Sequence, residues 1–330
     1  MGVRRPAVLA VDAGNSKTDV ALVDADGTIL GTGRSGGFQP PRVGVSAAVD
    51  IIGQAVAEAA RAAGLPRPAP GAPYADQVAA CLANADLPVE ERRLADALRA
   101  RGWGAATEVR NDTFAILRAG VDEPRGVAVV CGAGINCVGM LPDGRTARFP
   151  ALGQISGDWG GGAGLAAEAM FRAARAEDGR GGPTGLREAL PAHFGLGSVY
   201  ELIEALHLGT IEYRRTHEMV PVLFEVAAAG DPAARSVVER QADEVVALAA
   251  VALARLDLLE QEAPVVLGGG VLAAGNPLLN GRIEAGLAER APHARVSVVT
   301  APPVLGAALL GLDALGAPRE TYAKLRAHFG

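Results

Sequence analysis

Two glycine-bearing turns carry residue types that bind phosphate. The first is Asp12–Thr18, with the sequence DAGNSKT, and the second is Gly132–Asn136, GAGIN. Each follows an apolar strand and precedes a second strand of small and apolar residues, so each predicts a strand–turn–strand unit. Backbone N–H groups in such turns can cradle an anion. The pair of turns predicts that the chain holds the phosphates of one nucleotide and transfers a phosphoryl group.

The first turn places a cation and a carboxylate beside its glycine. Lys17 would meet a phosphate, and Asp12 at the strand end would hold Mg²⁺, through water. The N–H groups expected to cradle phosphate belong to Gly14, Asn15, Ser16, Lys17 and Thr18. The turn is not a Walker loop, because no glycine precedes the lysine and a strand follows where that loop has a helix. A plain hairpin turn is the alternative.

Asp112 is the candidate general base. It follows a short predicted strand, Glu108–Arg110, and precedes a predicted helix, Thr113–Ala119. A carboxylate at a strand end can accept the proton of an attacking hydroxyl. The sequence Asn111-Asp112-Thr113 is also typical of a helix N-cap, and one carboxylate cannot fully serve both purposes. Both interpretations stay open at the level of sequence.

Two further glycine segments suit close approach of a ligand. Gly153–Gly164, GQISGDWGGGAG, is predicted to be a loop, because interior positions of helices and strands disfavour so much glycine. Within it, Asp158 is a ligand candidate, and Trp159 is either an aromatic lid over a sugar or a core anchor. Gly268–Gly270 follows the strand VVL, where it suits adenosine or is a simple strand-to-helix turn.

Composition narrows the class of protein. The 330 residues carry a net charge of −6, which argues against nucleic acid or an anionic membrane as partner. The most apolar helix candidate, Val245–Leu259, contains charged residues and is shorter than the ~20 residues of a membrane span. No C-x-x-C pair and no secretory signal are apparent, so we expect a cytoplasmic protein. The three cysteines are Cys81, Cys131 and Cys137.

The elements that must position these residues alternate between strands and helices. Asp26-Gly27 and Asp143-Gly144 are turn dipeptides that close the second strand of each hairpin. Gly36–Gly44 is predicted to be a loop, and Val45–Ala63 and Pro277–Arg290 are predicted helices. The pattern indicates an α/β architecture in two halves.

Seven segments in order resemble the N-acetylglucosamine kinase group of the BadF/BadG/BcrA/BcrD-type ATPases, within the actin/hexokinase/Hsp70-like superfamily. They are DAGNSKT, NDTFAILRAG, GVAVVCGAGINCVG, GQISGDWGGGAG, AGDPAAR, VVLGGGV and PPVLGAALLG. The resemblance implies two ribonuclease-H-like domains around an interdomain cleft for ATP and sugar. We expect residues 1–121 to form the first domain, with the C-terminal helix 316–330 as an optional addition. Residues 122–315 would form the larger second domain, with a helical insertion.

The resemblance also implies an activity and the residues that carry it. Phosphate would pass from ATP, with Mg²⁺, to the 6-hydroxyl of an amino sugar, N-acetylglucosamine first and glucosamine second, in a homodimer. Asp112 matches the catalytic base. Besides the first turn, the nucleotide positions are Gly132, Ala133, Gly134, Gly268, Gly269 and Gly270. The substrate positions are Gln39, Asn84, Asn111, Asn136, Asp158 and Trp159.

The chain departs from the family pattern at two loops. The usual Gly-Thr-Gly-Ser is Gly132-Ala133-Gly134-Ile135 here, so backbone donors remain and both hydroxyls are gone. The usual Gly-Asp-Glu-Gly-Ser-Gly is Gly157–Gly162, where Trp159 replaces the glutamate. These losses keep open a sugar or nucleotide sensor with little catalysis. Another alternative is an activator ATPase of a 2-hydroxyacyl-CoA dehydratase, which would need paired cysteines for an iron–sulfur cluster.

Overall fold

The computed structural model describes residues 5–66 and 73–329 of the chain. These residues form two compact units. The first unit takes its described residues from Met1–Ala128, Val138–Pro150 and Val299–Gly330, and the second takes Val129–Cys137 and Ala151–Val298. Residues 122–128, 138–150 and 299–315 therefore group with the first unit, whereas we predicted them in the second domain. That the chain holds two ribonuclease-H-like domains divided near residue 121 stays a prediction.

The first unit is built on a mixed five-stranded sheet in the order β3-β2-β1-β4-β5. The predicted hairpin is confirmed, because β1 and β2 pair antiparallel and β3 adds a third antiparallel strand. On the other side, β1, β4 and β5 run parallel. The central, apolar β1 is buried along its whole length, as expected of a strand covered on both faces. The strands are β1 Val8–Ala13, β2 Lys17–Val23, β3 Ile29–Gly36, β4 Ala75–Leu82 and β5 Gly104–Asn111.

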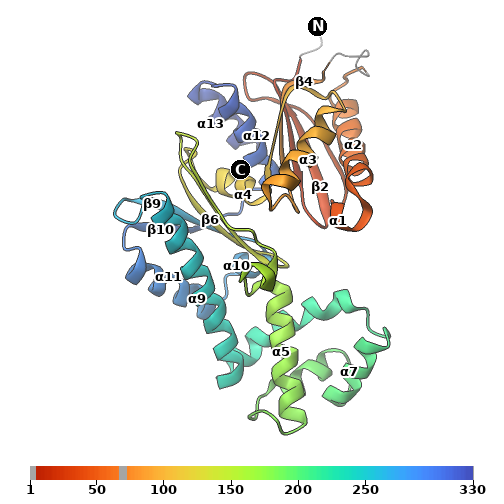
Figure 1. The fold of residues 1–330 in the computed structure, drawn as a ribbon, viewed down its shortest axis with the longest axis vertical. Helices are drawn as coiled ribbons and strands as arrows, with labels where there is room; N and C mark the ends of the chain where they lie inside the picture. Colours follow the sequence, from red (N-terminus) through yellow and green to blue (C-terminus); the bar gives the residue numbers. More distant parts are fainter. Residues whose placement is uncertain (1–4, 67–72, 330) are drawn as a thin grey trace. The chain divides into compact units, whose positions relative to one another are not determined.

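Helices cover both faces of this sheet (Figure 1). One face carries α2 (Val45–Ala62) and α3 (Pro88–Arg99), and the other carries α4 (Thr113–Gly120) and α12 (Pro303–Ala314). The last helix, α13 (Arg319–Phe329), packs on α12. A short helix, α1, spans Pro40–Val43, so the prediction of an irregular loop over residues 36–44 was wrong there. Proline at its first two positions favours a helical start, because those N–H groups have no helical partner.

The second sheet has the order β10-β9-β6-β7-β8 and is also mixed. Its described pairings are antiparallel between β7 and β8 and parallel between β9 and β10. The second predicted strand–turn–strand unit and its third strand are present. Together, the two mixed sheets and their helices confirm the predicted α/β fold class. The strands are β6 Gly126–Cys131, β7 Ile135–Met140, β8 Thr146–Arg148, β9 Ala263–Gly268 and β10 Ala294–Val298.

The second unit is rich in helices, and its longest is α9. Asp231 caps that helix by accepting a hydrogen bond from the backbone N–H of Ala234 at 2.8 Å. Within residues 5–66 and 73–329, no helix combines the length and the apolar character that crossing a membrane requires. The α-helices are α5 Gly161–Glu177, α6 Leu186–His193, α7 Val199–His207, α8 Met219–Ala228, α9 Pro232–Arg255, α10 Gly270–Ala273 and α11 Pro277–Arg290.

The glycine-rich segment 153–164 is more regular than its composition predicts. A 3₁₀ helix, η1, covers Gly153–Ser156, and α5 begins at Gly161, so the prediction of a continuous loop was wrong at both ends. Glycine is unfavourable in helix interiors, but these residues lie at a helix start, where a left-handed φ is accommodated. A second 3₁₀ helix, η2, covers Tyr213–Glu218.

Candidate functional site

Three aspartates lie at or just beyond the carboxyl ends of adjacent strands in the first unit. Asp12 is on β1, Asp86 follows β4, and Asp112 follows β5. Carboxyl ends of parallel strands meet at one edge of a sheet, where open α/β sheets bind ligands. Asp12 is only 8% exposed. Burial raises the pKa of Asp12 to about 7, with Asp112 and Asp19 adding to the effect and Lys17 opposing it.

The backbone N–H of Asp112 is hydrogen-bonded to β4, and the side chain of the preceding residue, Asn111, accepts from the first N–H of α4. The Asp112 N–H donates to the carbonyl of Leu82 at 3.2 Å, which continues the β4–β5 ladder. The side-chain oxygen of the buried Asn111 accepts from the N–H of Thr113 at 2.9 Å, and no capping bond is described for the Asp112 carboxylate. Burial raises the pKa of Asp112 to about 6, although the N–H groups of Thr113 and Asp112 lower it.

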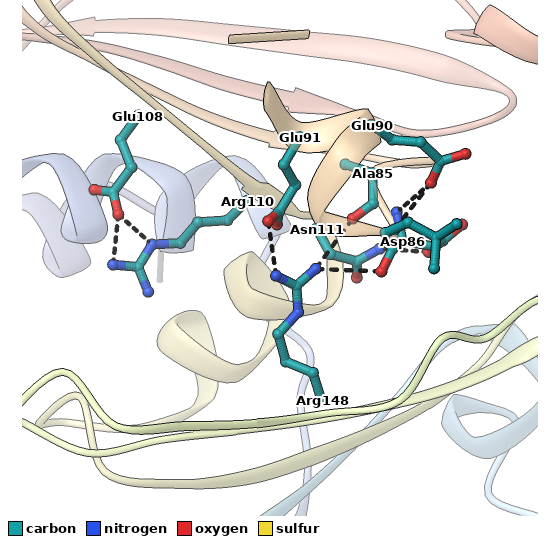
Figure 2. A network of polar contacts seen from close by, with 9 residues as sticks. Ala85, Asp86, Glu90, Glu91, Glu108, Arg110, Asn111 and Arg148 are labelled. Atoms are coloured by element: carbon teal, nitrogen blue, oxygen red, sulfur yellow. Dashed lines mark hydrogen bonds and ion pairs between the residues drawn. The ribbon is translucent and has the colours of Figure 1, made fainter. Parts of the chain in front are cut away.

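Asp86 lies at this edge, and Arg148, which ends β8 of the second sheet, donates to the backbone carbonyl of Asp86; sequence reasoning missed both residues. Asp86 Oδ1 accepts a hydrogen bond from Asn111 Nδ2 at 2.8 Å (Figure 2). Burial raises the pKa of Asp86 to about 7, helped by Asp112 and Glu90 and opposed by Arg148. No motif marks either residue, since an aspartate in a helix-start sequence such as ADLPVEE is ordinarily a turn former.

Three of the predicted binding residues meet at the first turn. Gln39 Nε2 donates to the backbone oxygen of Asn15 at 2.8 Å, and Asn84 Nδ2 donates to the side-chain oxygen of Asn15 at 3.0 Å. Asn84 has a φ of 61°, a left-handed conformation that asparagine tolerates. The structure thus brings together positions from three separate loops of the first unit.

The remaining residues of that turn are engaged within the hairpin. The N–H of Gly14 donates to the carbonyl of Lys17 at 2.9 Å, and the hydroxyl of the buried Thr18 donates to the carbonyl of Gly36 at 2.9 Å. Lys17 Nζ forms an ion pair with Asp19 at 2.7 Å. Asn15 and Ser16 are exposed at the tip. Phosphate binding by this turn stays a prediction.

The donor atoms at this edge of the first sheet are suited to Mg²⁺. Carboxylate oxygens are the hard donors that Mg²⁺ prefers, and it usually keeps several waters. The buried carboxylate of Asp12, close enough to Asp112 for repulsion, would gain from a cation. In residues 5–66 and 73–329 no group of three or more His, Cys, Asp or Glu side chains could hold a metal by itself. The residues fit a largely water-coordinated ion.

In the second unit, glycine segments pack backbone against backbone. The N–H groups of Gly162 and Ala163 donate to the carbonyls of Gly132 and Ala133, each at 2.8 Å. A Cβ on Gly161, whose φ is 67°, would lie 2.2 Å from the carbonyl oxygen of Gly134. This approach therefore requires glycine, and it joins the Gly132–Asn136 turn to the start of α5.

The third glycine segment reaches the same turn. A Cβ on Gly269, whose φ is 82°, would lie 2.4 Å from the carbonyl oxygen of Cys131. Gly268 ends β9, and Gly270 begins α10. The three glycine segments predicted to bind nucleotide or sugar, which are distant in sequence, are thus adjacent in the second unit.

The side chain of Gln241 contacts two of the segments in this glycine cluster, and no motif in the sequence marked it. Its side chain is fully buried on α9, and its Oε1 accepts from the N–H of Gly161 at 2.8 Å. Its Nε2 lies 3.6 Å from the sulfur of Cys131. A glutamine on an apolar helix face would have been the only hint, because a buried amide needs partners.

The predicted substrate residues of the second unit have local partners. Asn136 Oδ1 accepts from the N–H of Cys137 at 2.7 Å, and the carboxylate of Asp158 accepts from the Ser156 hydroxyl. The guanidinium of Arg240 lies over the ring of Trp159, 4.0 Å from its centroid. One face of the indole is thus covered by a cation. A sugar contact for these three residues stays a prediction.

The comparisons with known proteins agree with this architecture. The family model described as the BadF/BadG/BcrA/BcrD ATPase family matches residues 9–311. The N-acetylmuramic acid/N-acetylglucosamine kinase of Clostridium acetobutylicum is 25% identical over 190 residues, which are 58% of this chain and 62% of that protein. The N-acetyl-D-glucosamine kinase of Dictyostelium discoideum is 26% identical over 208 residues, 62% of this chain and 65% of that protein. The chain thus spans just under two thirds of both relatives.

Solved structures share the fold. A Chromobacterium violaceum protein assigned as an N-acetylglucosamine kinase superposes with a TM-score of 0.72 at 23% identity, over 94% of this chain and 100% of that one. A ROK family glucokinase of Streptomyces griseus, solved with glucose and AMPPNP, has a TM-score of 0.57 at 21% identity, over 93% and 98%. Because the family model spans nearly the whole chain, this protein belongs to the BadF/BadG/BcrA/BcrD ATPase family.

Proposed function

We propose that this protein is an ATP-dependent sugar kinase that phosphorylates the 6-hydroxyl of an amino sugar. N-acetylglucosamine is the proposed acceptor, and glucosamine or another amino sugar is the alternative. The observation that carries the proposal is the carboxylate of Asp112 at the sheet edge, with a pKa raised to about 6 and the helix start satisfied by Asn111. The names of the two kinase relatives support the substrate class.

In the proposed reaction, ionised Asp112 accepts the proton of the sugar hydroxyl. The hydroxyl oxygen bonds to the γ-phosphorus of ATP as the bond to the β-phosphate oxygen breaks, so ADP leaves and the proton remains on Asp112. The amides of Asn84, Gln39 and Asn111 would bind sugar hydroxyls, since each amide offers both a donor and an acceptor. Asn136, Asp158 and Trp159 complete the proposed acceptor contacts.

The nucleotide is proposed to bind through backbone groups. Exposed Ala133 and Gly134 in the second turn, and Asn15 and Ser16 in the first, offer N–H groups to phosphate. Gly268–Gly270 would let adenosine approach the backbone closely. Mg²⁺, when bound, would neutralise phosphate charge, with Asp12 holding it through water. We further propose that the protein is a cytoplasmic homodimer.

The other two candidate functions receive less support from the described residues. An activator ATPase would need cysteines at a subunit surface to hold a shared iron–sulfur cluster, but all three cysteines are buried. A sensor without catalysis would not need a carboxylate poised near neutral pH at the sheet edge. A measurable turnover separates the kinase from the sensor.

The test is release of ADP with ATP, Mg²⁺ and a panel of acceptors. The panel holds N-acetylglucosamine, glucosamine, N-acetylmannosamine, N-acetylmuramic acid, glucose and a control without sugar. Turnover on one amino sugar well above the control supports the proposal and identifies the acceptor. ATP binding without turnover on any sugar would contradict it and favour the sensor.

A further inference from the structure

Arg148 joins elements that carry the proposed acceptor residues. It ends β8, and its Nη1 donates to the carboxylate of Glu91 in the first turn of α3 at 2.7 Å. Its Nη2 makes longer hydrogen bonds to the carbonyls of Ala85 and Asp86, at 3.3 and 3.4 Å (Figure 2). The guanidinium also lies over the ring of Phe114, in the first turn of α4, 5.8 Å from its centroid. One planar group thus contacts two helix starts and the loop between β4 and α3.

Both N–H groups and carbonyl groups of that loop are hydrogen-bonded to charged side chains. The N–H groups of Asp86 and Leu87 donate to the carboxylate of Glu90 at 3.1 and 2.9 Å, while Arg148 binds the carbonyls. The Asp86 side chain then accepts from Asn111 Nδ2 at 2.8 Å, and Asn111 Oδ1 accepts from the N–H of Thr113. An unbroken series of contacts therefore runs from Arg148 through Asp86 and Asn111 to the residues that flank Asp112.

We propose that Arg148 is a positioning residue, which holds the Asp86 loop so that Asp86 and Asn111 orient Asp112 toward the acceptor. The proposal rests on the proposed kinase function and adds a residue that lies outside the seven sequence segments on which the family resemblance was recognised. Arg148 does not touch the reacting atoms. Its guanidinium fork meets a carboxylate and two carbonyls at once, a geometry that the single ammonium of lysine does not reproduce. A misplacement of about 1 Å in a phosphoryl acceptor can cost about 100-fold in rate.

A purely structural role for the Arg148–Glu91 ion pair makes different predictions. The two side chains are 26% and 18% exposed, so losing the pair should lower stability in either case. A structural role predicts similar effects for Arg148→Lys and Glu91→Gln, with kcat falling only as the folded fraction falls. A positioning role predicts that Glu91→Gln keeps most activity, because Arg148 still binds the two loop carbonyls.

The test compares Arg148→Lys with Arg145→Lys at a temperature where both are folded. Arg145 is the matched control, because it belongs to the same hairpin but pairs with Asp143 at an exposed site, where the side chains are 54% and 55% exposed. We expect Arg148→Lys to lower kcat about 10- to 100-fold with the KM for ATP unchanged. Arg145→Lys should match the wild type. Asp86→Ala removes the oxygen that accepts from Asn111 and should lower kcat similarly, and the double variant Arg148→Lys/Asp86→Ala should be no worse than the single variants.

Hydrogen exchange gives a readout that does not depend on turnover. Arg148→Lys should speed exchange of the amides of Asp86, Leu87 and Thr113, whereas Arg145→Lys should not. Wild-type kcat in Arg148→Lys, or unchanged exchange at Thr113, would overturn the positioning role. Absence of turnover in the wild-type protein would instead contradict the proposed kinase function, and the exchange data would still decide whether Arg148 orders this segment.

Discussion

The side-chain oxygen of Asn111 accepts the hydrogen bond of the Thr113 N–H at 2.9 Å, and this bond bears on the role of Asp112. The sequence leaves Asp112 either as a helix cap or as a base. With Asn111 on the Thr113 donor, no capping bond is described for the Asp112 carboxylate. The side chain of Asn111 thus serves the helix start, and that the Asp112 carboxylate acts as a general base stays a prediction.

Replacing Asp112 with asparagine should remove most of the activity. The variant keeps the size and polarity of the side chain but cannot accept the hydroxyl proton, and general bases contribute about 10²–10⁴-fold. We expect kcat to fall by about that factor while ATP affinity, measured by calorimetry, stays the same. Near-normal turnover in Asp112→Asn would disprove the assignment of the base.

The activity should depend on pH through the same carboxylate. Because burial raises the pKa of Asp112 to about 6, the group is still protonated at pH values where an ordinary aspartate is ionised. We expect kcat/KM to be low below about pH 6 and to rise to a plateau above it. Initial rates measured from about pH 5 to about pH 8 check this. A flat profile across that range would argue against a base with a raised pKa.

A methyl group at Gly161 should damage the glycine cluster of the second unit. The added Cβ would lie 2.2 Å from the Gly134 oxygen, on a backbone with a φ of 67°. We expect Gly161→Ala to lose about 1–3 kcal/mol of stability and to bind ATP more weakly. Gly164→Ala is the matched control, because nothing lies within 4 Å of its Cβ position in the same helix.

Thermal melts and ATP titrations of both variants provide the measurement. Gly164→Ala should be as stable as the wild type or more stable, by about 0.5–1 kcal/mol, because alanine favours a helix. Equal ATP affinities for Gly161→Ala and Gly164→Ala would show that the close approach has no part in nucleotide binding.

The cap of α9 should stabilise the second unit in a pH-dependent way. Burial acts to raise the pKa of Asp231, but hydrogen bonds from the N–H groups of Ala234 and Gly185 and from the Thr184 hydroxyl outweigh it, so the pKa is lowered. The stabilisation is therefore present above the unfolded-state pKa and is lost as the pH falls through the folded-state value. Asp231→Ala should cost about 1–2 kcal/mol near neutral pH.

Urea unfolding at neutral and acidic pH measures this effect. The difference between wild type and Asp231→Ala should shrink as the pH falls, because protonation weakens the same bonds in the wild type. Asp231→Asn should lose less than Asp231→Ala, since asparagine is also a good N-cap. A difference that stays constant with pH would show that the charge of Asp231 does not contribute.

Periodic and turn signals predicted the architecture well. The strands on both sides of Asp26-Gly27 and Asp143-Gly144 alternate strongly enough to be found from local pattern, and α11 was predicted with its observed ends. The glycine-rich segment was predicted less well. Glycine is needed at the start of α5 because the Gly134 backbone, which is distant in sequence, packs against Gly161. The positions that meet at Asn15 were identified only through the family resemblance.

Residues whose role is to hold other residues in place were not marked by any motif in the sequence. Asp86, Arg148 and Gln241 matter through contacts that tertiary packing creates, with partners up to 110 positions away in the case of Gln241. A charged residue in a short strand or after a turn is usually solvated, so nothing in the pattern distinguishes Asp86 or Arg148, and a single glutamine within a helix such as α9 is equally ordinary. Their recognition needed the coordinates of the hydrogen-bonded groups.

Identification of the product tests the proposed amino-sugar kinase activity most directly. The wild-type protein is incubated with ATP, Mg²⁺ and N-acetylglucosamine, or with the amino sugar that releases most ADP, and the mixture is analysed by phosphorus NMR and mass spectrometry. We expect one sugar 6-phosphate per ADP released, and about 10²–10⁴-fold less product in the same time with Asp112→Asn. ADP accompanied by inorganic phosphate, with no phosphorylated sugar, would contradict it.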